Sequence, residues 1–363
     1  MPAGPSAATS PAPRPVHPEP DRPGPDDALA PGARASRARP AGAPDAATGS
    51  TDGGRPPWRT SLAAYVALTK PRIVELLLVV TVPVMFLAAG GIPRLPTVLA
   101  TLVGGALAAG SANALNCYLD RDIDVAMART RSRPLPAHTV SPTRAAVFGI
   151  VLGAVAVGGL ALTVNVLSAA LTLAAILFYL VVYTIVLKRR TWQNVVWGGA
   201  AGCFPALIGW TAVTGRLAWA PVVLFGVVFC WTPPHTWALG MRYGADYAAA
   251  GVPMLPVVAG PRHVTRQMVA YALATTAVSL LLWPVAHTTL LYPAVALAAG
   301  GWLVAEAVAL ARRADRVVAA GGPGAAGPAG NLDPALRPMR FFHATNAHLA
   351  VVFLAVAVDA LLR

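Results

Sequence analysis

The feature of this sequence that most limits its possible folds is a succession of apolar segments, each about as long as the roughly 20 residues that a helix needs to cross a bilayer. They cover residues 73–90, 95–118, 144–164, 166–187, 195–214, 218–238, 267–286, 289–310 and 341–361. No strand-like alternation competes with them, whereas a membrane barrel would show short alternating segments. The pattern therefore predicts an all-α integral membrane protein with nine transmembrane helices.

The charges between these segments indicate how the chain lies in the membrane. Along the ten stretches outside the segments, from Arg55 to Arg363, Lys and Arg number 4, 1, 5, 0, 3, 1, 3, 0, 5 and 1, where the first count of five includes Arg144 at the start of the third segment. Rich and poor stretches alternate throughout, so the positive-inside rule places the N-terminus in the cytoplasm and the C-terminus outside. Topology thus explains the net charge of +13, and we expect the lipid bilayer, and no nucleic acid, as a partner.

The first 57 residues differ in composition from the rest. They contain 14 prolines and no Phe, Trp or Tyr. Such a segment cannot bury enough apolar surface to offset the entropy lost on ordering, and it lacks the continuous apolar stretch of a secretory signal. We expect residues 1–57 to be a disordered cytoplasmic tail and residues 58–363 to form one nine-helix domain.

A polar stripe lies at the cytoplasmic end of the second apolar segment. Asn116, Asp120 and Asp124 are spaced i, i+4, i+8, so on a helix they share one face. Two carboxylates and a carboxamide on one face repel one another unless a cation lies between them, and ionisable groups at membrane depth generally mark function. Oxygen ligands with open positions suit Mg²⁺, which bridges to substrate phosphates. The stripe therefore predicts a magnesium site.

The loop that follows the stripe carries further charges. Asp122 lies on the opposite side of the helix, and we expect it to be solvated and paired with Arg121 or Arg129. Arg129, Arg131 and Arg133 beside a bound metal are typical of residues that neutralise an anion. Positive-inside topology alone would also supply three arginines here, and both interpretations stay open.

Four stretches of the chain resemble a known group of enzymes. The run NCYLDRDIDVAMARTRSRPLP, residues 116–136, resembles the first Asp-rich motif of the intramembrane polyprenyltransferase superfamily, which includes 4-hydroxybenzoate polyprenyltransferase. Within this superfamily, the run is most similar to the protohaem IX farnesyltransferase (haem O synthase) family. Three other stretches agree in the same order: LTKPRIVELLL at 68–78, VYTIVLKRRTWQN at 182–194 and WTPPHTWALGMRYGADYAAAGVPMLPVV at 231–258.

The resemblance implies a fold, an activity and a location. It implies nine helices around a central cavity, with active-site loops on the cytoplasmic side of a bacterial plasma membrane. The implied activity is a Mg²⁺-dependent transfer of a farnesyl group from farnesyl diphosphate to a vinyl group of haem B, giving haem O for haem–copper oxidases. Haem would be a substrate, since no CxxCH attachment motif occurs. Haem A synthase or oxidase assembly factors are the protein partners that this activity implies.

The resemblance also implies a second part of the metal site. Asp246 would join Asn116, Asp120 and Asp124 in binding metal and in catalysis. Relatives that prenylate aromatic acids usually carry a second acid four residues after the first, where this chain has Ala250. Without the second acid, fewer protein ligands remain for a metal on that side. Its absence favours the haem-farnesylating members of the superfamily over those that prenylate aromatic acids.

The diphosphate would be bound by residues near the end of the fourth span. Tyr183, Lys188 and Arg189 align with a segment that holds the diphosphate in relatives, and the arginines of the first loop would assist. Lys188 is one of only two lysines in the chain. The other, Lys70, could contribute together with Arg72, although anchoring at the membrane interface explains both equally well.

His235 is the candidate residue for the haem side. It lies near the end of the sixth predicted span, next to two prolines that we expect to open the backbone. It would bind haem or orient the acceptor, and the alternative is a hydrogen-bonded packing role. His343 and His348 open the last span, and a haem role and an interfacial role remain equally open for them.

Two other functions compete with haem farnesylation. A sister enzyme that prenylates a quinone or aromatic-acid precursor would share the diphosphate half and differ on the acceptor side, where Ala250 and His235 favour haem. A nine-span transporter would show inverted repeats and ionisable residues near the middle of the membrane. The acids of this chain cluster instead at helix ends.

Overall fold

The computed structural model describes residues 57–321 and 334–363, apart from the side chains of 57–60 and 72–78. These residues belong to one unit, Gly54–Arg363. Every regular element in the described ranges is a helix, which confirms the predicted all-α class. The expected tail, 1–57, lies outside the described residues except for Pro57, so its boundary and its character stay predictions.

Within the described residues, nine helical segments correspond to the nine predicted spans. In the part described, eight of them are long and apolar enough to cross a membrane, and α2 has a shorter apolar stretch, Val79–Ala89. Seven segments are single helices: α2 (Pro71–Ala89), α3 (Leu95–Leu119), α5 (Pro142–Thr163), α9 (Trp219–Arg242), α12 (Pro261–Ala286), α13 (Leu291–Ala319) and α14 (Pro338–Leu361).

Two spans are composite, and short helices fill the connections. One span joins α6 (Val166–Leu177) to a π-helix, η1 (Phe178–Leu187), and the other joins α7 (Asn194–Gly198), the 3₁₀ turn η2 (Gly199–Cys203) and α8 (Phe204–Thr214). The short elements are α1 (Pro57–Thr69), α4 (Arg121–Ala126), α10 (Gly244–Ala249), α11 (Leu255–Val258) and η3 (Pro334–Leu336).

Helix α9 departs from the expected opening of the backbone. It continues through Pro233 and Pro234 and ends at Arg242. Proline is tolerated in bilayer helices because neighbouring groups satisfy the carbonyls that it frees. His235 therefore lies within a continuous helix.

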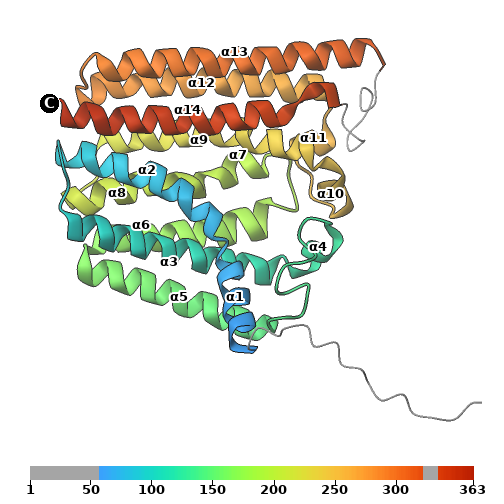
Figure 1. The fold of residues 1–363 in the computed structure, drawn as a ribbon, viewed down its shortest axis with the longest axis horizontal. Coiled ribbons are helices and arrows are strands. Elements are labelled where there is room, and N and C mark those ends of the chain that lie inside the picture. The colour runs from blue at the N-terminus through green and yellow to red at the C-terminus, as the bar shows by residue number, and fades with distance from the viewer. Residues whose placement is uncertain (1–56, 322–333) are drawn as a thin grey trace, which may run out of the picture. The chain divides into compact units, whose positions relative to one another are not determined.

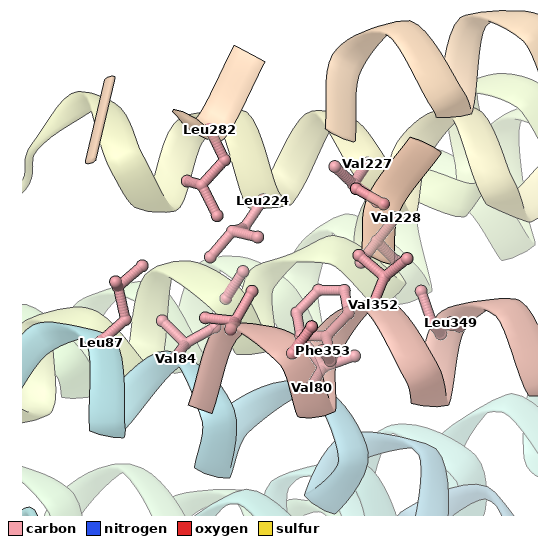
Figure 2. Close-up of a cluster of buried hydrophobic side chains, with 14 of the residues drawn as sticks. Val80, Val84, Leu87, Leu224, Val227, Val228, Leu282, Leu349, Val352 and Phe353 are labelled. Atoms are coloured by element: carbon pink, nitrogen blue, oxygen red, sulfur yellow. The ribbon is translucent and has the colours of Figure 1, made fainter. Parts of the chain in front are cut away.

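The largest buried cluster lies where α2, α9, α12 and α14 meet. Figure 2 shows aliphatic side chains and one phenyl ring converging from these helices, among them Val80, Val84, Leu224, Leu282 and Phe353. Large apolar side chains also face outward; Leu162 is 89% and Trp219 76% exposed. Such exposure suits a lipid surface and would be costly in water.

The short helices that carry the polar loops gather at one end of the bundle. In Figure 1, α4, α10 and α11 lie at the same end, and the C-terminus lies at the opposite end. Helices α3 and α5 pack closely at this level, since the Ser111 hydroxyl donates to the Gly149 carbonyl across 2.7 Å. The two Asp-containing loops are thus brought to one end of the molecule, as the predicted topology requires.

Candidate active site

The polar stripe spans the junction between α3 and α4. Asn116 lies in the last turn of α3, Asp120 joins the two helices, and Asp124 lies in α4; all three are buried. The N–H of Asp120 bonds to the Asn116 carbonyl and the N–H of Asp124 to the Asp120 carbonyl, both across 2.9 Å. The helical ladder that the spacing predicted thus continues through the junction, although Asp120 itself leaves helical geometry (φ −94°, ψ 8°).

The two carboxylate oxygens of Asp120 have different surroundings. Asn116 Nδ2 donates to Oδ2 across 2.6 Å, and the Lys188 ammonium forms an ion pair with the same oxygen. Oδ1 has no hydrogen-bond partner among the described residues, and the nearer Arg189 guanidinium nitrogen lies 3.7 Å away. A buried, ionised oxygen without a full set of partners is costly, and it is disposed to bind a cation.

The π-helix η1 brings residues of the fourth span to the stripe. The N–H of Lys188 bonds to the carbonyl of Tyr183, five residues earlier, across 2.8 Å. The Thr184 hydroxyl donates to the Tyr179 carbonyl (2.9 Å) and accepts from Asn116 Nδ2 (3.2 Å). π-Turns are rare and concentrate at functional sites. Sequence reasoning missed Thr184, because no residue pattern distinguishes a π-turn from an α-turn.

Tyr183 is held by close packing. Its ring lies 5.4 Å from that of Tyr179, centroid to centroid. A Cβ added at Gly198 of α7 would overlap the Tyr183 side chain. Gly198 therefore lets α7 approach η1, and this approach fixes the position of the tyrosine that was predicted to bind diphosphate.

Asp124 has its own cation. Arg133 Nη1 lies 2.9 Å from each of its carboxylate oxygens, and the Thr130 hydroxyl donates to the Asp124 carbonyl. Of the three predicted loop arginines, Arg133 therefore joins the stripe. Arg131 is exposed and has no side-chain partner among the described residues.

Lys70 is the second lysine of the site. Its ammonium donates to Asn116 Oδ1 across 3.0 Å, which supports a contribution to the site over interface anchoring alone. Lys70 adopts a left-handed conformation (φ 51°) between α1 and α2, where strain is often retained for function. Asn113 supports this turn by donating to the Thr69 carbonyl.

The two lysines have pKa shifts of opposite sign. Burial lowers the pKa of Lys70, and the positive charges of Arg133 and Lys188 lower it further. Burial also opposes the charged form of Lys188, but Tyr183 and Asp120 outweigh it and raise the pKa of that ammonium. The difference follows from the partners, since Lys188 meets a carboxylate and Lys70 a neutral amide.

Asp122 has a different partner from the expected one. It pairs with Arg189, whose two terminal nitrogens lie 2.6 and 2.7 Å from its oxygens, and not with Arg121 or Arg129. The hydrogen bond from Arg189 is the main reason why the pKa of Asp122 falls to about 2. Arg121 lies over the Tyr118 ring instead. Asp122 is still largely exposed, with 60% of its side chain accessible, as expected of a solvated acid.

The second loop meets the first through Arg129. Its guanidinium donates to the Tyr247 hydroxyl across 3.2 Å and lies over the rings of Tyr243 and Tyr247 at 5.3 and 5.6 Å. Asp246 lies between these two tyrosines in the sequence. Its side chain is partly buried and has no hydrogen-bond or ion-pair partner among the described residues. In the part of the chain that the structure describes, no hydrogen bond joins its side chain to the other three predicted metal ligands.

Ala250 packs in an apolar cluster that joins the two loops. The cluster contains Ile123 and Met127 from the first loop and Val252 and Met254 from the second. A carboxylate at position 250 would be placed against these side chains. Alanine in place of the acid therefore fits the apolar packing at position 250.

An apolar cavity of about 270 Å³ lies along α3, and its lining reaches Asn113, one helical turn before Asn116. Gly105, Ala108, Ala109 and Ala112 line it along one face of α3, and the same face continues to Asn116. Asn113, Thr172 and Tyr179 contribute polar groups to its lining, and Ile176, Phe204 and Ile208 contribute apolar ones. Small residues at i, i+3, i+4 and i+7 spacing keep this face of α3 open.

His235 lies apart from the stripe, between two aromatic rings. Its ring stacks on Trp231 (4.1 Å) and on Phe342 (4.4 Å), and Nδ1 lies 2.8 Å from the Thr345 hydroxyl. His343 is exposed, whereas His348 is fully buried and neither of its ring nitrogens has a hydrogen-bond partner in the described chain.

The residues of the stripe fit a divalent cation that is completed by substrate oxygens. Among the described residues, no group of three or more His, Cys, Asp or Glu side chains could hold a metal by itself. The stripe nevertheless offers a carboxamide, two buried carboxylates and the unpartnered Asp120 Oδ1. Such a sparse set of hard oxygen ligands suits Mg²⁺, which keeps waters and shares phosphate oxygens.

Solved structures define the class of fold. The structure of a digeranylgeranylglyceryl phosphate synthase matches with a TM-score of 0.62 over 84% of this chain and 99% of that chain, at 15% identity. A UbiA homologue from Archaeoglobus fulgidus bound to DMAPP and Mg²⁺ matches with a TM-score of 0.56 over 81% and 99%, at 16% identity. The helical bundle thus shares the fold of these two proteins.

Sequence relatives narrow this class. A protein named protoheme IX farnesyltransferase from Cutibacterium acnes is 55% identical over 305 residues, which are 84% of this chain and 87% of that protein. One of the same name from a Nocardioides species is 57% identical over 301 residues, 83% and 92% of the two chains. A model described as the UbiA prenyltransferase family matches residues 77–320. This chain belongs to the UbiA prenyltransferase family.

Proposed function

We propose that this protein transfers the farnesyl group of farnesyl diphosphate to a vinyl group of haem B, and so makes haem O. The observation that carries the proposal is the stripe of buried oxygens, paired with Lys188 and Arg133, close to an apolar cavity whose lining includes Asn113, one helical turn before Asn116. The relatives named protoheme IX farnesyltransferase match over most of both chains and support haem as the acceptor.

The basic residues around the stripe bind the diphosphate. Lys188, Arg133 and Lys70 approach it from three different segments, and Arg189 lies beside Asp120. Negative charge grows on the diphosphate as its bond to the farnesyl carbon breaks. Positive groups fixed in advance beside that charge lower the barrier, because they need no reorganisation at the moment of reaction. Tyr183, Arg129 and Arg131 form no side-chain hydrogen bond with the stripe in the described chain, and we expect weaker roles for them.

Asn116, Asp120 and Asp124 would hold Mg²⁺, with Asp246 contributing from the second loop. When bound, the metal supplies Lewis-acid stabilisation to the leaving diphosphate. Lys188 and Arg133 then have a second role, because their ion pairs hold the carboxylates of Asp120 and Asp124 in place.

The apolar cavity binds the isoprenoid chain. Its small residues on α3 leave room for methyl branches, and its walls exclude water from the developing allylic cation. The electron-rich vinyl group of haem attacks that cation. Water then adds to the porphyrin-stabilised cation that results, and loss of a proton leaves the hydroxyl group of haem O.

The proposed location is the bacterial plasma membrane, with the polar loops in the cytoplasm and the C-terminus outside. The alternation of Lys and Arg supports this sidedness. The placement of the C-terminus at the opposite end from α4 and α10 accords with it (Figure 1).

A competition between acceptors tests the proposal. The purified chain in detergent receives Mg²⁺ and farnesyl diphosphate with equal amounts of haem B and 4-hydroxybenzoate, and the products are identified by mass. We expect haem O and unchanged aromatic acid. A prenylated aromatic acid with unchanged haem would establish the sister activity instead, and no prenylated product from either acceptor would refute the proposal.

A further inference from the structure

The imidazole of His235 is accessible only at its edge. Trp231 and Phe342 stack on its two faces, with interplanar angles of 20° and 28°. Both faces are therefore taken, and only the ring atoms at the rim can meet another molecule. Of the two nitrogens, Nδ1 is engaged by Thr345, and Nε2 has no hydrogen-bond partner among the described residues.

The hydrogen bonds of Thr345 determine which nitrogen of His235 carries the proton. The Thr345 hydroxyl lies 2.6 Å from the Phe342 carbonyl, which can only accept. A hydroxyl has a single proton, so the proton of Thr345 is used in that bond. The hydroxyl must then accept at its contact with His235, and Nδ1 must donate. A neutral His235 therefore carries its proton on Nδ1 and has a lone pair on Nε2.

Thr345 also fixes the ring that covers His235. Its carbonyl accepts from Trp231 Nε1 across 2.7 Å. One residue of α14 thus orients both the imidazole and one of its stacking partners on α9. The two histidines of α14 itself lack this arrangement, since His343 is exposed and His348 has no polar partner at either nitrogen in the described chain.

We propose that Thr345 is a positioning residue that holds His235 in the Nδ1-protonated tautomer, so that Nε2 can coordinate the iron of the haem substrate. The inference rests on the proposed function, because that function supplies the haem. Metal-bound histidines commonly donate their second N–H to such a partner, and removing the partner weakens metal binding by about 10- to 100-fold. The edge-on access of Nε2 suits an axial ligand, whose ring stands upright on the porphyrin.

Haem titration tests this role without relying on turnover. The purified full chain is titrated with haem B, and the absorbance spectrum and the dissociation constant are recorded for the wild type and four variants. We expect Thr345→Val, which keeps the shape and removes the hydroxyl, to weaken binding at least about tenfold. Thr345→Ser should bind like the wild type. His235→Ala should lose the histidine-ligated spectrum, and His343→Ala, on the same helix as Thr345, should keep it.

Wild-type affinity and spectrum in Thr345→Val would overturn the positioning role. An unchanged spectrum in His235→Ala would overturn the ligand assignment. Elution from a sizing column shows which variants are folded, and recovery in Thr345→Ser separates loss of the hydroxyl from general damage. The same preparations are assayed for haem O. A wild type that binds haem through His235 but forms no haem O contradicts the proposed function alone, whereas haem O formation with a Thr345→Val spectrum like the wild type contradicts only the inference.

Discussion

At the scale of one residue, the buried carboxylate of Asp120 depends mainly on one ion pair for its charge balance. Its side chain is 1% exposed, and its charge is balanced mainly by one ammonium, that of Lys188. Removing one partner of a buried ion pair leaves an uncompensated charge, whereas replacing both with neutral groups is far less costly. The pair therefore contributes both to folding and to the electrostatics of the site, and variants can separate the two contributions.

Replacing Lys188 by Met should destabilise the protein and abolish activity. We expect a loss of about 3–5 kcal/mol in the free energy of unfolding, as for other broken buried pairs, measured by tryptophan fluorescence during titration with SDS. Adding Asp120→Asn should restore most of the stability but none of the activity. Arg190→Ala, an exposed neighbour, serves as control and should change stability by less than about 0.5 kcal/mol. Equal stability of Lys188→Met and the wild type would contradict the pairing.

The residue scale is also where the sequence was least informative. The spacing of Asn116, Asp120 and Asp124 predicted that they lie together, because helical periodicity is local. The partners of Asp120 and Asp122 come from Lys188 and Arg189, which lie more than 60 residues away in the chain. Such pairings depend on how helices pack, and no local pattern encodes them.

At the scale of elements, the π-helix η1 and the short helix α7 shape the end of the bundle where we propose that the diphosphate binds. The apolar run at 166–187 predicted a span and its length, but not its change from α- to π-helical bonding at Phe178. Tyr183 and Gly198 then fit so closely that no larger residue is accommodated at position 198 without movement. The position of Tyr183 is thus a consequence of how two elements meet.

Replacing Gly198 by Ala tests this contact between elements. The new methyl group overlaps the Tyr183 side chain down to its Cβ, and overpacking of this kind costs about 1–3 kcal/mol. We expect lower stability and a higher KM for farnesyl diphosphate. Gly158→Ala, in α5 with open space around it, is the matched control and should be neutral or slightly stabilising. Equal stability and equal KM in the two variants would show that the Tyr183 side chain can move aside without loss of stability, and would contradict the close fit.

At the scale of the whole molecule, nine spans place the polar loops and the C-terminus at opposite ends (Figure 1). The alternation of charge predicted this arrangement, because an odd number of crossings separates the termini. Neither hydropathy nor charge predicted that α4 and α10 would be joined by Arg129 and the apolar cluster around Ala250. That contact is tertiary and depends on the closure of the bundle.

Cysteine accessibility checks the sidedness. The three native cysteines are buried or half-buried, so added ones report on exposed loops. In intact cells a membrane-impermeant maleimide should label Ile92→Cys, in the first external connection, and spare Ala137→Cys, in the loop after the acid stripe. Permeabilised cells should label both. Labelling of Ala137→Cys in intact cells would reverse the proposed orientation.

The central claim is that the stripe on α3 and α4 performs farnesyl transfer to haem, and one panel of variants tests it most directly. Haem O formation from haem B, farnesyl diphosphate and Mg²⁺ is measured by mass for Asp120→Asn, Asp124→Asn and Asp122→Asn. The first two should lose at least about 100-fold in rate, as when a fixed electrostatic group is removed from an active site. Asp122→Asn, in the same segment but exposed, should stay close to the wild type. Full activity in Asp120→Asn or Asp124→Asn, or an equal loss in all three variants, would contradict the account.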